Sequence, residues 1–165
     1  MLDQKLIKQQ LVEWMKEFVE TPNPALGNWA PCPYARTARI NNKIEIKFAD
    51  VGDLSASVQA SLSDLDTKEV VVICFDHTNI EPVALQSWVE SYNLTLMKDN
   101  YVILEDHPDA PEYTNKVKMN FGHCGLVFMQ KLDKLNAAAD QLREKGYYDT
   151  WDTEQLNTVV TWRYQ

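Results

Sequence analysis

The chain has 165 residues, of which 45% are hydrophobic and 24% are charged, a composition typical of one folded domain and unlike that of a disordered chain. Its net charge of −8 works against non-specific binding to nucleic acid, which depends on neutralising phosphates with lysine and arginine. No apolar run approaches the roughly 20 residues that cross a bilayer, and residues 1–5 do not begin a signal peptide. We therefore expect a cytoplasmic protein that binds neither nucleic acid nor membrane.

The first part of the chain predicts a helix followed by an unusual loop. Residues 1–20 read as an amphipathic helix because apolar side chains recur at helical spacing. Residues 21–40 form a proline-rich loop in which Cys32 stands between two prolines. Proline fixes its own φ and lacks an N–H, so Cys32-Pro33 predicts a helix start with the sulfur beside the free N–H groups of the first turn. That position, together with Arg36 and Arg39, is expected to favour the thiolate and to make Cys32 reactive.

The segment 41–146 predicts the folded core. Its apolar patterns predict strands and helices in alternation, and with the first helix the order is αβαβαββα. This order predicts a single domain over 1–165 of the α/β or α+β class, with helices flanking a small mixed sheet of about four strands. The expected strands lie at 44–48, 70–75, 101–104 and 125–130. The tail at 147–165 is aromatic, and its rings either pack over the core or form a patch for a partner.

Three cysteines without a Cys-x-x-Cys spacing do not make a disulfide framework, so we expect free thiols. Cys74 lies inside an apolar run and is expected to be a buried small hydrophobe. Cys124, next to His123, is either a core residue or a functional one.

Polar residues cluster at the ends of the predicted strands. If the first three strands run in the same direction, Asp76 and His77 after one strand meet His107 and Asp109 after another. If the last strand is antiparallel, His123 joins them at the same edge. Two plainer interpretations stand beside this one: His77 caps the helix that starts near residue 80, and His107-Pro108 forms only a turn.

Two chemistries fit these residues, and a third interpretation involves none. In the first, Cys32 is a nucleophile or redox group and His107 the acid–base group of an enzyme. A small anionic substrate is then held by Arg36 and Lys116, with Arg39 and Asn115 as further binding residues. In the second, a divalent iron or zinc ion is bound by a subset of residues at the sheet edge: His77, His107, His123 and Asp109. In the third, the chain is an acidic, non-catalytic module that binds a protein partner through its aromatic tail. The oligomeric state stays open.

Several short motifs occur in the order seen in a known family. These are Cys32-Pro33-Tyr34-Ala35-Arg36, His107-Pro108, Tyr113-Thr114-Asn115-Lys116 and Leu126-Val127-Phe128. Over residues 11–140 the chain resembles an uncharacterised family of small bacterial proteins with Cys-Pro-Phe-Ala-Lys/Arg, a later His-Pro and Thr-Asn-Arg before a final strand and helix. The resemblance implies that one pocket holds Cys32, Arg36, His107, Asn115 and Lys116.

A shorter stretch, from Cys32 to Arg39, is similar to the cysteine motif of omega-class glutathione transferases, which begin a helix with Cys-Pro-Tyr/Phe-Ala-x-x-x-Arg. This likeness adds a thiol cosubstrate to the expectations.

Overall fold

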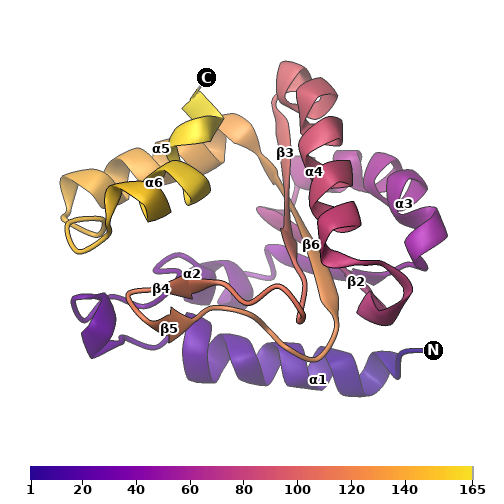
Figure 1. The fold of residues 1–165 in the computed structure, drawn as a ribbon, viewed down its shortest axis with the longest axis horizontal. Coiled ribbons are helices and arrows are strands. Elements are labelled where there is room, and N and C mark those ends of the chain that lie inside the picture. Colours follow the sequence, from indigo (N-terminus) through magenta and orange to yellow (C-terminus); the bar gives the residue numbers. More distant parts are fainter. Residues whose placement is uncertain (165) are drawn as a thin grey trace.

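The computed structural model describes residues 1–164 and has a four-stranded mixed sheet at its centre, with helices on both faces (Figure 1). The predicted α/β class is confirmed, and the tail expected to reach Gln165 is described as far as residue 164. The strands are β1 Ile44–Phe48, β2 Val70–Phe75, β3 Tyr101–Asp106, β6 Gly125–Lys131 and the short pair β4 Tyr113–Thr114 and β5 Val117–Lys118. The α-helices are α1 Gln4–Trp14, α2 Ala35–Ile40, α3 Leu54–Ser61, α4 Pro82–Leu96, α5 Leu132–Glu144 and α6 Thr153–Val159.

The strand order in the main sheet is β1-β2-β6-β3. β1 and β2 are parallel, and β6 lies antiparallel between β2 and β3, so the first three strands run in one direction, as predicted. The ends of β2 and β3 and the start of β6 therefore share one edge of the sheet. The helix start predicted at Cys32-Pro33 leads into α2, whereas the sequence missed α6 and the β4–β5 hairpin.

Alternation along β2 divides the core into two layers. Val71, Ile73 and Phe75 face α3 and α4, whereas Val72 and Cys74 face α1. Cys124 lies in the second layer and is as fully buried as Cys74, so the core interpretation of both cysteines is confirmed.

Gly125 is required where β2 meets β6. It pairs with Phe75, and a Cβ at this position would overlap the phenylalanine ring. The absent side chain thus lets the Phe75 ring cross over the start of β6.

The C-terminal part of the chain packs against the loop that carries Cys32. Tyr147 contacts Trp29 edge-on with ring centroids 5.7 Å apart, and its hydroxyl donates to the Pro31 carbonyl at 2.5 Å. Tyr148 and Trp151 pack on Tyr147 in turn. These rings pack within the molecule, the first of the two roles expected for the tail.

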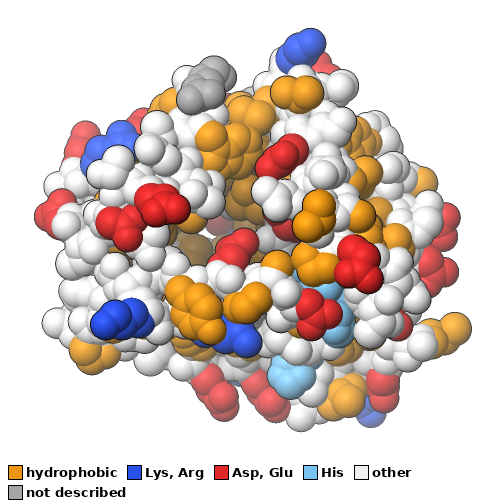
Figure 2. Space-filling model, viewed as in Figure 1, with side chains coloured by type: hydrophobic (Ala, Val, Ile, Leu, Met, Phe, Trp, Pro, Cys, Tyr) orange, Lys and Arg blue, Asp and Glu red, His pale blue; other side chains and the backbone are white. Residues whose placement is uncertain are grey.

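The surface is hollowed on the face drawn in Figure 2, in the region where α5 and α6 stand opposite β3 in Figure 1. None of the helices in residues 1–164 combines the length and apolar character needed to cross a bilayer.

Candidate functional site

Two histidines meet at the sheet edge where β2 and β3 end. The rings of His77 and His107 lie edge to face, with centroids 5.4 Å apart and planes at 88°. His123 precedes β6 at the same edge, but its ring packs on Phe121 and lines a separate surface pocket beside Trp14. The predicted convergence thus holds for two of the three histidines.

His107 uses both ring nitrogens in contacts with the backbone. Nε2 lies 2.8 Å from the Ile80 carbonyl oxygen and donates to it, while Nδ1 accepts the N–H of Asp109 at 3.0 Å. The side chain is only 3% exposed. His107 therefore ties the end of β3 to the segment before α4, and this structural role speaks against the predicted acid–base role.

The loop after β2 is capped by Asp76 and not by His77. The Asp76 carboxylate accepts the Thr78 N–H at 3.0 Å and the Thr78 hydroxyl at 2.6 Å. These two bonds hold the pKa of Asp76 below its usual range. The Nδ1 atom of His77 is buried without a hydrogen-bond partner among the described residues.

The metal interpretation is not supported by the arrangement of these side chains. Within residues 1–164, no three His, Cys, Asp or Glu side chains come together as metal ligands do. His107 has no free nitrogen, His123 lies apart, and Asp109 approaches His107 with its backbone N–H. The geometry of the described residues therefore gives no support to the predicted iron or zinc site on His77, His107, His123 and Asp109 as a set.

Cys32 lies between the end of the first helix and the C-terminal aromatic rings. Its N–H donates to the Val19 carbonyl at 3.0 Å, and the neighbouring Pro31 carbonyl accepts the Tyr147 hydroxyl. Although part of the residue is exposed, burial raises the pKa of the Cys32 thiol, and the charge of Glu20 raises it further. The N–H groups of Tyr34 and Ala35 act in the opposite direction, as the helix start predicted, but they do not prevail. The net direction therefore favours the thiol over the expected thiolate.

The two arginines do not activate Cys32. Arg39 binds Glu20 through two hydrogen bonds of 2.7 and 2.8 Å, and Arg36 is exposed on α2. Glu20 is a residue that sequence reasoning missed: its side chain is only 4% exposed and its charge acts on the thiol. Nineteen residues separate it from Arg39, so no local spacing in the sequence could have revealed the pair.

The hairpin β4–β5 brings Asn115 to the loop that leads to Cys32. Asn115 and Lys116 form its tip with φ of 50° and 68°, and the Asn115 amide donates to the Ala25 carbonyl at 3.3 Å and to the Thr150 hydroxyl at 3.1 Å. The family resemblance assigns five residues to one pocket. Four of them lie on the two segments that meet here, the hairpin and the loop that leads through Cys32 into α2: Cys32, Arg36, Asn115 and Lys116. We call this meeting of segments the junction. The recorded contacts of His107 are with other segments.

A second acidic group, around Glu112, also escaped sequence reasoning. Burial, with the charges of Asp106 and Glu105, raises the pKa of Glu112 to about 7. Asn120 organises this loop by accepting the Glu112 N–H at 2.7 Å and donating to Asp106 at 2.7 Å. The only signal in the sequence was the density of carboxylates between residues 105 and 112.

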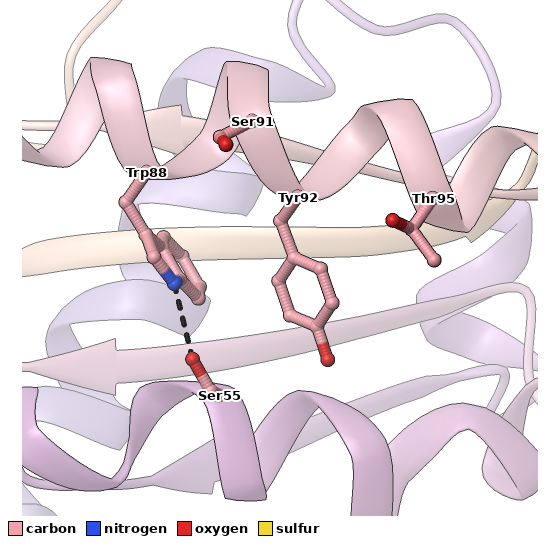
Figure 3. Close-up of a pocket in the computed structure, with 5 residues that line it drawn as sticks. All are labelled: Ser55, Trp88, Ser91, Tyr92 and Thr95. Atoms are coloured by element: carbon pink, nitrogen blue, oxygen red, sulfur yellow. Dashed lines mark hydrogen bonds between the residues drawn. The ribbon is translucent and has the colours of Figure 1, made fainter.

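A shallow groove of about 390 Å³ runs between α3 and α4 and is drawn in Figure 3. Trp88 and Tyr92 project from α4 toward α3, and the Trp88 Nε1–H donates to the Ser55 hydroxyl at 3.1 Å. The Tyr92 hydroxyl accepts a hydrogen bond from Gln59. Because their polar atoms already bind α3, these rings serve the packing of the two helices.

Comparison of the chain with models of protein families, with curated proteins and with solved structures finds no match. The two family resemblances accordingly remain predictions.

Proposed function

We propose that this protein is an enzyme that binds a small anionic molecule beside Cys32 and uses the Cys32 thiol as its nucleophile. The observation that carries the proposal is the position of the buried Glu20 carboxylate: Arg39 holds it through two hydrogen bonds, and the Cys32 N–H binds the carbonyl of Val19, the residue before Glu20. A nucleophile, a base and a third group that orients the base are the parts that thiol and hydroxyl enzymes share.

Glu20 replaces His107 as the acid–base group in this proposal. Cys32 rests as a neutral thiol, so attack on a substrate needs a group that accepts its proton as the sulfur–carbon bond forms. The Glu20 carboxylate accepts that proton and returns it to the leaving group, while the N–H groups of Tyr34 and Ala35 stabilise negative charge on the sulfur. Water then releases the bound group and restores the thiol.

The charge of the substrate follows from the cations around the junction. Arg39 is neutralised by Glu20, which leaves Arg36, four residues after Cys32, as the guanidinium for a carboxylate or phosphate. Lys116 at the hairpin tip offers a second, exposed cation, and Asn115 fixes the position of that tip.

Ester probes test this reaction without a known substrate. With 4-nitrophenyl acetate, the wild-type protein should release one equivalent of nitrophenolate in a burst, and Cys32→Ser should release none. Glu20→Gln should slow the burst if Glu20 is the base. If Glu20 acts only as a nearby charge, the same variant lowers the pKa of the thiol and the burst becomes faster, which would contradict the proposal.

Substrate charge is tested with a matched pair of esters. Arg36→Gln should slow acylation by the anionic 4-nitrophenyl hydrogen succinate but not by the neutral acetate. Glu144→Gln, at an exposed position on α5, is the control for Glu20→Gln because both variants lose one negative charge. Thermal unfolding of each variant separates a lost site from a lost fold. A burst that persists in Cys32→Ser would refute the proposal.

A further inference from the structure

An open pocket of about 260 Å³ lies on the surface of α1, and Cys32 is not among its lining residues. Gln10, Glu13 and Trp14 line it from α1, Glu17 from the π-helical turn Met15–Val19, and His123 from the segment before β6. On the face drawn in Figure 2, acidic side chains lie over α1 beside a histidine. The pocket takes no part in the function proposed above.

We propose that this pocket binds a small organic cation that carries a primary ammonium group. Trp14 supplies the aromatic wall, and its position is fixed by Phe18, with ring centroids 6.1 Å apart, and by Phe121, at 5.4 Å. The face of an indole ring attracts a cation through its quadrupole, and tryptophan does so best among the aromatic side chains. A ring held on two sides keeps its orientation before the ligand arrives, which lowers the entropic cost of binding.

Glu13 and Glu17, which line the same pocket as Trp14, supply the negative charge. Among the ion pairs within residues 1–164, none includes either carboxylate. Glu13 accepts one hydrogen bond, from the Gln9 amide at 3.0 Å, which leaves most of its acceptor capacity unused. Two carboxylates outside these ion pairs, in one pocket with an aromatic ring, match an ammonium group, which offers three donors and a positive charge.

The arrangement selects an organic cation over a metal ion. Glu13, Glu17 and His123 line the same pocket, yet within the described residues they do not converge as ligands of one ion. A cation that fills the space between them must therefore be larger than a bare metal ion. The net charge of −8 further raises the concentration of cations near the surface.

The test follows the indole N–H signal of Trp14 in a ¹⁵N-correlated NMR spectrum, assigned with Trp14→Phe. We expect 1,4-diaminobutane to shift this signal saturably, and the uncharged 1,4-butanediol, of the same length, to leave it unchanged. The double variant Glu13→Gln/Glu17→Gln should weaken binding at least about tenfold, which corresponds to about 1.4 kcal/mol. Glu144→Gln should bind as the wild type does.

Three results would overturn the proposal. These are an equal response to the diol, binding that survives in the double glutamine variant, and a response to Mg²⁺ that matches the response to the diamine. Because Gln keeps the shape of Glu on an exposed helix face, the double variant is expected to fold, and its helical circular dichroism checks this.

Discussion

Replacement of His107 tests whether this residue supports the fold or the chemistry. In His107→Ala, the Ile80 carbonyl and the Asp109 N–H lose their hydrogen-bond partner inside a site where the native side chain is 3% exposed. A buried polar group left without a partner costs about 1–3 kcal/mol, so the two together lower the free energy of unfolding by about 2–6 kcal/mol. His107→Asn keeps an acceptor near the Nδ1 position for the Asp109 N–H and should recover about half of that loss.

Urea unfolding followed by far-UV circular dichroism measures these differences, provided that the m-value is unchanged among the variants. A loss below about 1 kcal/mol in the alanine variant would refute the structural role, because a solvated or redundant contact costs no more than that. The ester burst at Cys32 separates the two roles. It should persist in His107→Asn under conditions where that variant is folded, whereas an acid–base role for His107 requires the burst to be lost.

Three further predictions follow from single contacts. Gly125→Ala should lower the free energy of unfolding by about 1–3 kcal/mol because its Cβ overlaps the Phe75 ring, and chemical denaturation measures this. Because the pKa of Glu112 is raised from 4.5 to about 7 on folding, ionising this carboxyl destabilises the native state as the pH rises through that window. Glu112→Gln should therefore raise the melting temperature at pH 8 relative to the wild type and have little effect at pH 4; an equal gain at both pH values would contradict this. Alkylation of Cys32 by iodoacetamide should be slow at pH 7 and rise through the alkaline range, because burial raises the pKa of the thiol; fast labelling at pH 7 would refute it.

The strands of the sheet could be predicted because the pattern of apolar residues in each one indicates which of its faces are buried. The continuous apolar run at Val70–Phe75 indicated a strand buried on both faces, and the alternation at Ile44–Phe48 indicated a half-buried strand. The position of β6 between β2 and β3 could not be obtained in the same way. Periodicity tells which face of a strand is buried but does not name the strand beside it.

The elements that were missed are too short to show a period. Each strand of the β4–β5 hairpin has two residues, and its turn places both Asn115 and Lys116 at positive φ. Asparagine is a familiar turn residue in that conformation, but lysine is not, so the usual Asn-Gly signal is absent. Contacts with Ala25 and Thr150, 90 and 35 residues away, hold this hairpin in place.

The Cys-Pro motif alone was insufficient to predict the direction in which the pKa of Cys32 is shifted. Cys-Pro correctly indicated N–H groups near the sulfur, since those of Tyr34 and Ala35 lower the pKa of the thiol. The net direction of the pKa shift is nevertheless upward, because burial of the thiol group and the charge of Glu20 outweigh those two contacts.

The bond between Arg39 and Glu20 determines how the charges around Cys32 act. A free Arg39 would stabilise the thiolate, as its spacing from Cys32 suggested, whereas an Arg39 bound to Glu20 leaves the thiol beside a compensated carboxylate. Such a pair suits proton transfer better than permanent ionisation, because the carboxylate is held in place while the sulfur stays neutral until a substrate arrives. The chemistry proposed for this site therefore depends on Glu20 more than on any residue within the Cys-Pro motif itself.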